Sequence, residues 1–398
     1  MIIQSMLDTD LYKFTMMQAV LHQFPGVEVE YRFKCRTEGV NFAPYVDKIS
    51  NEIDYLCKEL RFSEDELGYL RGLRFIKSDF VQFLKLFKFE RNYVNIEIDD
   101  KGELDIHIKG PWLHTILFEV PILAIVSEVY SENQNGSYTH ARELLADKID
   151  RVKLATNWWE FEPFNVADFG TRRRNCLAWQ REVVATLKDG LPSFFVGTSN
   201  VLLAKEQNLT PIGTMAHEWI QAHQALYRVA DSQFMAFENW AKEYRGDLGI
   251  ALSDTVGLNA FLCDFDMYFA KLFDGTRQDS GNPHEYACRM IDHYKEMNID
   301  PKTKTIVFSD GQTIATAIEL WKDFSDKIGV SFGIGTHLTN DFGYKALQIV
   351  LKMIKCNEQP VAKLSNSPGK YMCEDADYSE YLRTAFNRRE AEWMQKRA

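Results

Sequence analysis

Residues 305–337 read TIVFSDGQTIATAIELWKDFSDKIGVSFGIGTH, which is a short apolar run, a helix-like stretch and a second short apolar run. Short runs rich in β-branched and aromatic residues are typical of strands buried on both faces, and an intervening helix implies that two such strands are parallel. Eight such runs lie between residues 164 and 366: NVADFGTRR, FFVGTSN, PIGTMAHE, GIALSDT, FDGTRQDSG, TIVFSDG, VSFGIGTH and VAKLSNS. The pattern predicts an α/β fold whose parallel sheet is closed or nearly closed into a (β/α) barrel.

Each of the eight runs ends in a small polar or charged cluster. Barrels of this kind hold their active sites at the rim formed by the carboxyl ends of the strands, so the clusters should surround one cavity. The residues brought together there would be Arg172, Ser199, His217, Asp254, Arg277, Asp279, Asp310 and the GIGTH turn at 333–337.

Residues 1–140 predict a smaller mixed α/β domain that precedes the barrel. We expect an arm and an amphipathic helix in 1–24, a strand at 28–36, helices within 43–88 and a β-hairpin at 93–110. The apolar stretch 111–130 contains charged and proline residues, which favours a buried core segment over a membrane span.

The barrel domain is expected to span 141–370 and to be followed by a helical tail at 371–398. Helical segments predicted at 340–355 and 375–396 are expected to pack back against the first domain.

The composition excludes some classes of partner. A net charge of −11 without a long basic run argues against nucleic acid and against anionic membranes. The seven cysteines form no C-x-x-C pair, which indicates free thiols in a reducing compartment and no zinc site. Charged residues near the N-terminus do not fit a secretory signal. We therefore expect a cytoplasmic protein with small, phosphorylated substrates.

Two segments have the chemistry of an anion-binding site. FGTRRR at 169–174 combines an aromatic ring, which can stack on a planar heterocycle, with guanidinium groups that pair with carboxylate or phosphate. Its alternative role is a core Phe before a solvated helix start. GIGTHLTND at 333–341 offers glycines before a helix, which lets backbone N–H groups close on a phosphate. A tight structural turn is the alternative.

Three carboxylates follow successive strands at Asp254, Asp279 and Asp310, and Arg277 accompanies them. Such groups can bind sugar hydroxyls or stabilise a cationic sugar transition state, although each Asp could instead cap the next helix. His217 begins a long helix and could act as an acid, base or nucleophile, or be structural. The HEWIQAH spacing places its two histidines on different helix faces, which excludes zinc.

The ordered set of motifs from TDLYKFTM at 9–16 to KLSNSPGK at 363–370 resembles the nicotinate phosphoribosyltransferases, in particular the bacterial type. The resemblance implies an irregular α/β barrel with a smaller α/β domain, as in type II phosphoribosyltransferases. It also implies formation of nicotinate mononucleotide and pyrophosphate from nicotinate and phosphoribosyl pyrophosphate, in NAD salvage. ATP would be a co-substrate and Mg²⁺ a cofactor held mainly by pyrophosphate.

The resemblance also assigns roles to single residues. Tyr12 would reach the site of the partner subunit in a homodimer and cover the pyridine ring opposite Phe169, while Arg172 would pair with the nicotinate carboxylate. His217 would be phosphorylated by ATP. The other assignments are Asp254, Arg277 and Asp279 for the ribosyl and pyrophosphate groups, Asp310 for the same pocket, Gly333, Gly335 and Thr336 for the 5′-phosphate, and Thr198 and Ser199 of GTSN for the substrate.

Other functions remain open on the sequence. A nicotinamide phosphoribosyltransferase shares most of these motifs but has Asp where this chain has Ser199, and a quinolinate enzyme is shorter and lacks the His motif. A Schiff-base lyase could use Lys363 on the last strand. A barrel that only binds a ligand is the non-enzymatic alternative.

Overall fold

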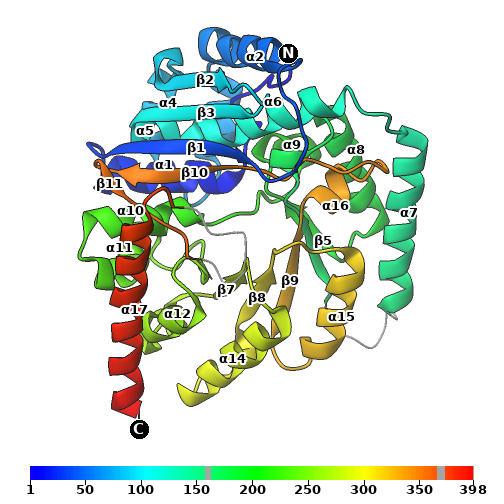
Figure 1. The fold of residues 1–398 in the computed structure, drawn as a ribbon. Helices are drawn as coiled ribbons and strands as arrows, with labels where there is room; N and C mark the ends of the chain where they lie inside the picture. Colours follow the sequence, from blue (N-terminus) through cyan, green and yellow to red (C-terminus); the bar gives the residue numbers. More distant parts are fainter. Residues whose placement is uncertain (157–162, 365–372, 398) are drawn as a thin grey trace.

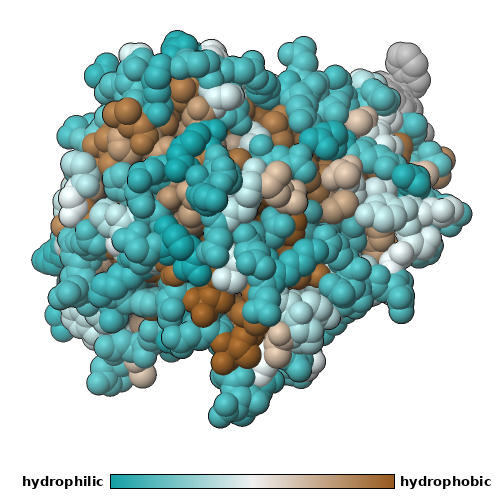
Figure 2. Space-filling view, turned by 90° about the horizontal axis from the view of Figure 1, so that it is seen from above, coloured by the Kyte–Doolittle hydropathy of each residue, from teal (hydrophilic) through white to brown (hydrophobic). Residues whose placement is uncertain are grey.

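The computed structural model describes residues 1–156, 163–364 and 373–397. Two sheets organise the chain (Figure 1). One is a six-stranded parallel sheet in the order β5-β4-β9-β8-β7-β6, and the other is a five-stranded antiparallel sheet in the order β11-β10-β1-β3-β2. Figure 2 shows one face of the molecule, on which hydrophilic side chains prevail and apolar ones form only small patches.

Six of the eight predicted runs form the parallel sheet. Its strands are β4 (Asn165–Asp168), β5 (Phe195–Thr198), β6 (Ile250–Leu252), β7 (Gly275–Gln278), β8 (Thr305–Phe308) and β9 (Gly329–Ile334). All five pairings between neighbours are parallel. The β8-α15-β9 unit is the segment quoted first above, with α15 at Ile314–Phe324. The expected barrel architecture is therefore present.

The run PIGTMAHE at 211–218 was expected as a strand but forms none. Instead it crosses from β5, one edge strand of the sheet, to β6, the other edge strand. Ile212 N–H donates to the Thr198 carbonyl at the end of β5, at 2.9 Å, and the Thr214 hydroxyl donates to the Ile250 carbonyl of β6, at 2.9 Å. This crossing segment closes the barrel where a regular strand would stand, which makes the barrel irregular.

The run VAKLSNS at 361–367 was also expected as a strand. Its described residues form no strand: Val361 N–H donates to the Ile354 carbonyl of β10 at 3.0 Å, and Leu364 N–H donates to the Thr255 carbonyl at 2.8 Å. Residues 365–367 of the run lie outside the described residues.

Helices surround the parallel sheet. They are α7 (Tyr138–Ala155), α8 (Leu177–Gly190), α9 (Val201–Gln207), α10 (His217–Leu226), α11 (Ser232–Tyr244), α12 (Leu258–Asp264), α13 (Met267–Leu272), α14 (Pro283–Glu296), α15 and the short α16 (Thr336–Thr339). Caps fix several helix starts: the Asn200 side chain accepts from Leu203 N–H in α9, and Asn282 precedes Pro283 in α14.

The antiparallel sheet contains β1 (Glu28–Cys35), β2 (Val94–Ile98), β3 (Leu104–Pro111), β10 (Ile349–Cys356) and β11 (Gln359–Pro360). The helices that accompany it are α1 (Leu11–Gln23), α2 (Val46–Glu59), α3 (Glu64–Arg71), α4 (Ser78–Leu86), α5 (Trp112–Thr115) and α6 (Glu119–Ser131). The predicted hairpin is β2-β3, and the predicted capping box of Ser63 and Glu66 begins α3.

The helix predicted at 340–355 is wrong, because residues 349–356 are β10, the neighbour of β1. In the segment IVLKMIKC the two lysines are three residues apart, a spacing that also fits a helix, and pairing with β1 decides in favour of a strand. The amphipathic helix expected in 1–24 is α1, but its residues from Leu11 to Val20 are buried on every side, including Lys13.

The stretch Trp112–Ser131 is the one helical segment in the described residues that is apolar and long enough to cross a membrane, and it is 94% buried. It is a core element, as predicted. The C-terminal helix α17 (Ala376–Arg397) packs on α12 rather than on the antiparallel sheet, because Arg389 pairs with Asp264 at 2.6 Å and with Asp231 at 2.8 Å.

Candidate active site

A cavity of about 440 Å³ lies at the carboxyl ends of the parallel strands, and β10 of the antiparallel sheet lines its other side. Most of the residues singled out in the sequence face this cavity: Tyr12, Phe169, Arg172, Ser199, His217, Arg277, Asp279, Asp310, Gly333, Gly335, Thr336 and Lys363. Thr198 and Asp254 do not.

One end of the cavity is an aromatic slot with a guanidinium group. Phe169 follows β4, and its ring packs so closely on Gly333 that a Cβ there would lie 2.2 Å from it. The Tyr12 ring centroid is 5.8 Å from the Cζ of Arg172. Arg172 is held by carboxylates on two sides, with its Nε 3.5 Å from Asp10 and its Nη1 3.8 Å from Glu119. The slot suits a planar aromatic carboxylate.

Tyr12 reaches this slot within its own chain, which corrects the expectation that it acts in the partner subunit. Its helix α1 is buried in the same chain, and Leu11 N–H donates to the Ser199 carbonyl at 2.9 Å. Asp10 forms a β-bridge with Asn200. An arm fixed by these bonds has no free length with which to reach a second molecule. The Tyr12 hydroxyl has no hydrogen-bond partner in the described part of the chain.

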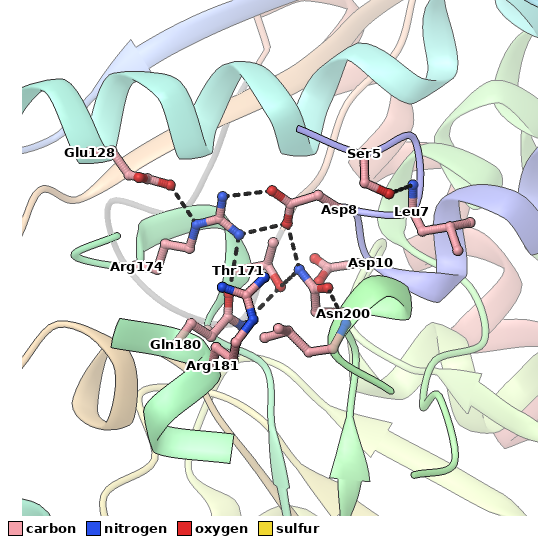
Figure 3. A network of polar contacts seen from close by, with 12 residues as sticks. Ser5, Leu7, Asp8, Asp10, Glu128, Thr171, Arg174, Gln180, Arg181 and Asn200 are labelled. Carbon is pink, nitrogen blue, oxygen red and sulfur yellow. Dashed lines mark hydrogen bonds and ion pairs between the residues drawn. The ribbon is translucent and has the colours of Figure 1, made fainter. Parts of the chain in front are cut away.

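A buried polar network supports the turn that carries Arg172 (Figure 3). The Arg174 guanidinium is fully buried and donates to both oxygens of Asp8, at 2.6 and 2.8 Å, and to Glu128 at 2.6 Å. Asp8 also accepts from the Asn200 side chain at 2.8 Å. Burial raises the pKa of Glu128 to about 7, against the opposing effect of Arg174.

Thr198 belongs to this network and makes no contact with the cavity, which corrects its assignment to the substrate. Its hydroxyl donates to Asp168 at 2.7 Å and accepts from Asn200 N–H at 3.1 Å. Gln180 donates to the same Asp168 oxygen at 2.8 Å. Burial raises the pKa of Asp168 to about 6. Thr198 therefore fixes the end of β5, next to Ser199.

His217 begins α10 and donates from Nε2 to Asp254 at 2.8 Å. Burial, together with Lys363, lowers the pKa of His217 to about 4, so the ring is neutral. Burial opposes ionisation of Asp254, but Lys363 and His217 outweigh it and hold the pKa of the carboxyl well below its usual range. An ionised Asp254 can only accept, so the proton of the ring is on Nε2 and Nδ1 keeps its lone pair.

Asp254 also binds Lys363 at 2.7 Å and accepts from Ser280 at 2.5 Å. It is 2% exposed and lies behind His217, so the expected contact with sugar or pyrophosphate is corrected to a role in holding these neighbours. Asp279 does face the cavity. Burial works against its ionisation, but Arg277 and Lys363 lower its pKa to about 2.

The oxygen and nitrogen atoms of His217, Asp254 and Asp279 lie within 4.8 Å of one another, as in a metal site. Lys363 Nζ is 2.7 Å from Asp254 and 4.0 Å from Asp279, so a cationic side chain already pairs with both carboxylates. These residues do not fit a resident divalent ion. Magnesium carried by pyrophosphate, as expected above, needs no such ligand set.

Two turns in the cavity wall have donors for phosphate. Asp310 to Thr313 form the turn between β8 and α15, where Gly311 has a φ of +57°, and the N-terminus of α15 follows. Gly335 lies where a Cβ would be 3.0 Å from the Phe169 carbonyl, so the backbone there can take only glycine without a shift. Both turns line the cavity.

Several lining residues were missed in the sequence. Arg36 follows β1, and Lys352 is in β10; neither segment carries a motif, and both come to the barrel only through the pairing of β1 with β10. Burial lowers the pKa of Lys352 to about 8. With Arg173, which donates to the Ile349 carbonyl at 3.0 Å, they make a cationic wall.

The buried ion cluster around Lys13 was also missed. Its ammonium group donates to Glu119 and to Glu218, both at 2.6 Å. Lys13 is beside Tyr12 and Glu218 is beside His217, so the cluster joins the helix of the slot to the helix of the histidine. The partners Glu119 and Glu218 come from distant segments, so the local sequence TDLYK contains no signal of the cluster.

Comparison with known proteins identifies the family. Residues 164–390 match the nicotinate phosphoribosyltransferase (NAPRTase) family, and residues 7–127 match the N-terminal domain of the same family. The chain belongs to the nicotinate phosphoribosyltransferase family. The resemblance seen in the motifs is confirmed.

Relatives and solved structures agree with this result. The chain is 58% identical over 391 residues to nicotinate phosphoribosyltransferase of Burkholderia cenocepacia, with 97% of each chain covered, and 55% identical over 397 residues to that of Acidovorax sp., with 97% and 98% covered. The crystal structure of nicotinate phosphoribosyltransferase from Vibrio cholerae superposes with a TM-score of 0.93 at 40% identity, over 97% of this chain and 94% of that one. The predicted fold class is thereby confirmed.

Proposed function

We propose that this protein is a nicotinate phosphoribosyltransferase that forms nicotinate mononucleotide and pyrophosphate from nicotinate and phosphoribosyl pyrophosphate, in NAD salvage. The carrying observation is the slot of Phe169, Tyr12 and Arg172 in a cavity that is also lined by the two phosphate-type turns. The family membership and the 58% identity to a curated enzyme of this name support the same activity.

In the proposed reaction, the pyridine nitrogen forms a bond to C1 of the ribose as the bond from C1 to the pyrophosphate oxygen breaks. The electron pair of that bond leaves with pyrophosphate. Asp279 stays ionised in the cavity and can stabilise positive charge that develops on the sugar. Arg277 and the cationic wall of Arg36, Arg173 and Lys352 can take up the charge of the leaving group. Mg²⁺, when bound to pyrophosphate, would lower the cost of its departure.

ATP is proposed as a co-substrate that phosphorylates His217. The Nδ1 lone pair would attack the γ-phosphorus, ADP would leave with the electron pair of the broken bond, and hydrolysis of the phosphohistidine would release phosphate. Support comes from the neutral ring, from the Nε2 hydrogen bond that orients it, and from its place in the cavity lining.

The test is to incubate the protein with phosphoribosyl pyrophosphate, Mg²⁺ and a panel of pyridine acids and amides, with and without ATP labelled in the γ-phosphate. We expect nicotinate mononucleotide as the product, and acid-labile label on the protein. His217→Ala should lose the label and the stimulation by ATP. His223→Ala is the matched control, because His223 is equally buried on the same helix but binds Trp219 and Asn239 away from the cavity. Label retained in His217→Ala would refute the phosphohistidine.

The competing functions make different predictions in the same assay. A nicotinamide enzyme would prefer the amide. Those enzymes have Asp where this chain has Ser199, so here no second carboxylate stands beside Asp10. A Schiff-base lyase would be trapped by borohydride at Lys363, but its ammonium group is paired with Asp254 at 2.7 Å, and a protonated amine is not a nucleophile.

A homodimer and a cytoplasmic location complete the proposal. The seven free cysteines suit a reducing compartment. Light scattering of the purified protein would measure the oligomeric state.

A further inference from the structure

Asp10 places a carboxylate at the edge of the slot that would receive the substrate's own carboxylate. It is 1% exposed, and its Oδ2 is 3.5 Å from Arg172 Nε. Its Oδ1 accepts from the Ser199 hydroxyl at 2.7 Å. Figure 3 shows Asp10 next to Asn200 and Thr171, beside the network of Arg174. An anionic ligand bound to Arg172 would therefore lie near the buried Asp10 carboxylate, which pairs with the same guanidinium group.

The hydroxyl of Ser199 links this acid to the cavity. A serine has one hydrogen to donate, and an ionised Asp10 takes it. Ser199, which lines the cavity, then presents only lone pairs to a bound carboxylate, and these repel it. With a proton on Asp10 the direction reverses: Asp10 donates to Ser199, and Ser199 is free to donate to the ligand.

We infer that Asp10 takes up one proton when a pyridine carboxylate binds, and that this proton turns the Ser199 hydroxyl toward the ligand. The inference rests on the proposed function, because it takes nicotinate as the ligand of the slot. The proton comes from solvent and forms the O–H bond of the Asp10 carboxylic acid; no other bond changes. Asp10 would thus be a residue that determines the preference for acid over amide.

The surroundings of Asp10 favour this proton. Burial raises the pKa of Asp10, and Glu119 on α6 adds to the rise, while Arg172, Ser199 and Thr171 oppose it. The ligand's negative charge acts in the same direction as Glu119. Glu119 itself does not compete for the proton: burial opposes its ionisation, but Lys13, Lys352 and Arg172 lower its pKa to about 2.

Other titrating groups near Asp10 are separable from it. Tyr12 is two residues further along the chain, in α1, and burial raises its pKa well above the usual range, so it stays neutral. Asp168, with a pKa of about 6, faces Asp10 from β4, and Asp8 is paired with Arg174. Lys352 titrates at about 8 on the opposite wall. Within the described residues, the Ser199 hydroxyl bonds to Asp10 and not to the side chains of these groups.

The test is calorimetric titration of nicotinate into the protein at about pH 6.5, where Lys352 keeps its charge, in buffers of different ionisation enthalpy. The slope of binding enthalpy against buffer enthalpy counts the protons exchanged. We expect an uptake approaching one proton for the wild type and none for Asp10→Asn, whose amide imitates the protonated acid. Glu119→Gln is the matched control, because it also removes a carboxylate at Arg172; it should reduce the uptake without abolishing it, since Glu119 only adds to the effect of burial on the pKa of Asp10.

Two outcomes would overturn the inference: no proton uptake by the wild type while nicotinate binds, or unchanged uptake in Asp10→Asn. Ser199→Ala gives a separate readout, with nicotinate affinity about 10- to 100-fold weaker and proton uptake retained, because only the hydrogen bond to the charged ligand is lost. Unchanged affinity in Ser199→Ala would also refute it. Failure of the proposed function has another signature, since the wild type would then neither bind nicotinate nor convert it.

Discussion

Replacing Arg174 with Met should destabilise the protein strongly, because Arg174 is a buried cation with three charge-assisted bonds and no access to water. The change leaves Asp8 and Glu128 buried without their cation. Removing one member of such a group costs about 3–5 kcal/mol. Glu128 already has a pKa of about 7 and can escape much of the penalty by taking a proton, whereas Asp8 keeps only the Asn200 bond. We therefore expect a loss near the lower end, about 3 kcal/mol.

Arg181→Met is the matched control for this prediction. Arg181 also makes two bonds to one carboxylate, at 2.6 and 3.0 Å from Glu206, but both side chains are more than a third exposed. Exposed pairs contribute about 0–1 kcal/mol. The measurement is urea unfolding of both variants, followed by tryptophan fluorescence. Equal destabilisation of the two variants would refute the reasoning from burial. Because Arg174 is two residues from Arg172, the KM for nicotinate should also rise in Arg174→Met alone.

Two further predictions concern the cavity walls. Lys352 is charged below its pKa of about 8 and neutral above it, so kcat/KM for phosphoribosyl pyrophosphate should fall as the pH rises through that value. Lys352→Arg should remove the fall. The same fall in the variant would show that Lys352 is not the group responsible. Gly333→Ala should displace the Phe169 ring and raise the KM for nicotinate at least about 10-fold. Gly26→Ala, which has open space around its Cβ, is the control and should leave the KM unchanged. Equal KM values in the two variants would place Phe169 away from the pyridine ring.

Strand ends and helix starts were predictable from the sequence because each depends on local pattern. Phe169, Arg172, His217 and Asp279 follow or precede buried runs, and the barrel geometry alone brings such residues to one rim. The capping box of α3 was predictable for the same reason, since its bonds join residues three apart.

The remaining features depend on contacts between distant residues. Lys352 faces the cavity because β10 pairs with β1. The segment IVLKMIKC, with its lysines three residues apart, has no local signal that separates a strand from a helix. Asp254 and Thr198 were wrongly predicted to contact the substrate. A residue at a strand end can point either into the cavity or behind it, and the local sequence does not distinguish the two directions. Lys13 became a buried ion because its partners Glu119 and Glu218 come from elsewhere in the chain.

The pairing of β1 with β10 bears on how the chain is made. Glu28 N–H bonds to Asn357, 329 residues later, so the N-terminal sheet cannot be completed until nearly the whole polypeptide has left the ribosome. Until then β1 has one open edge, and open edges invite pairing with other chains. Nascent chains interrupted before residue 349 should therefore need chaperone protection. The cationic wall of the cavity would be among the last parts of the enzyme to form.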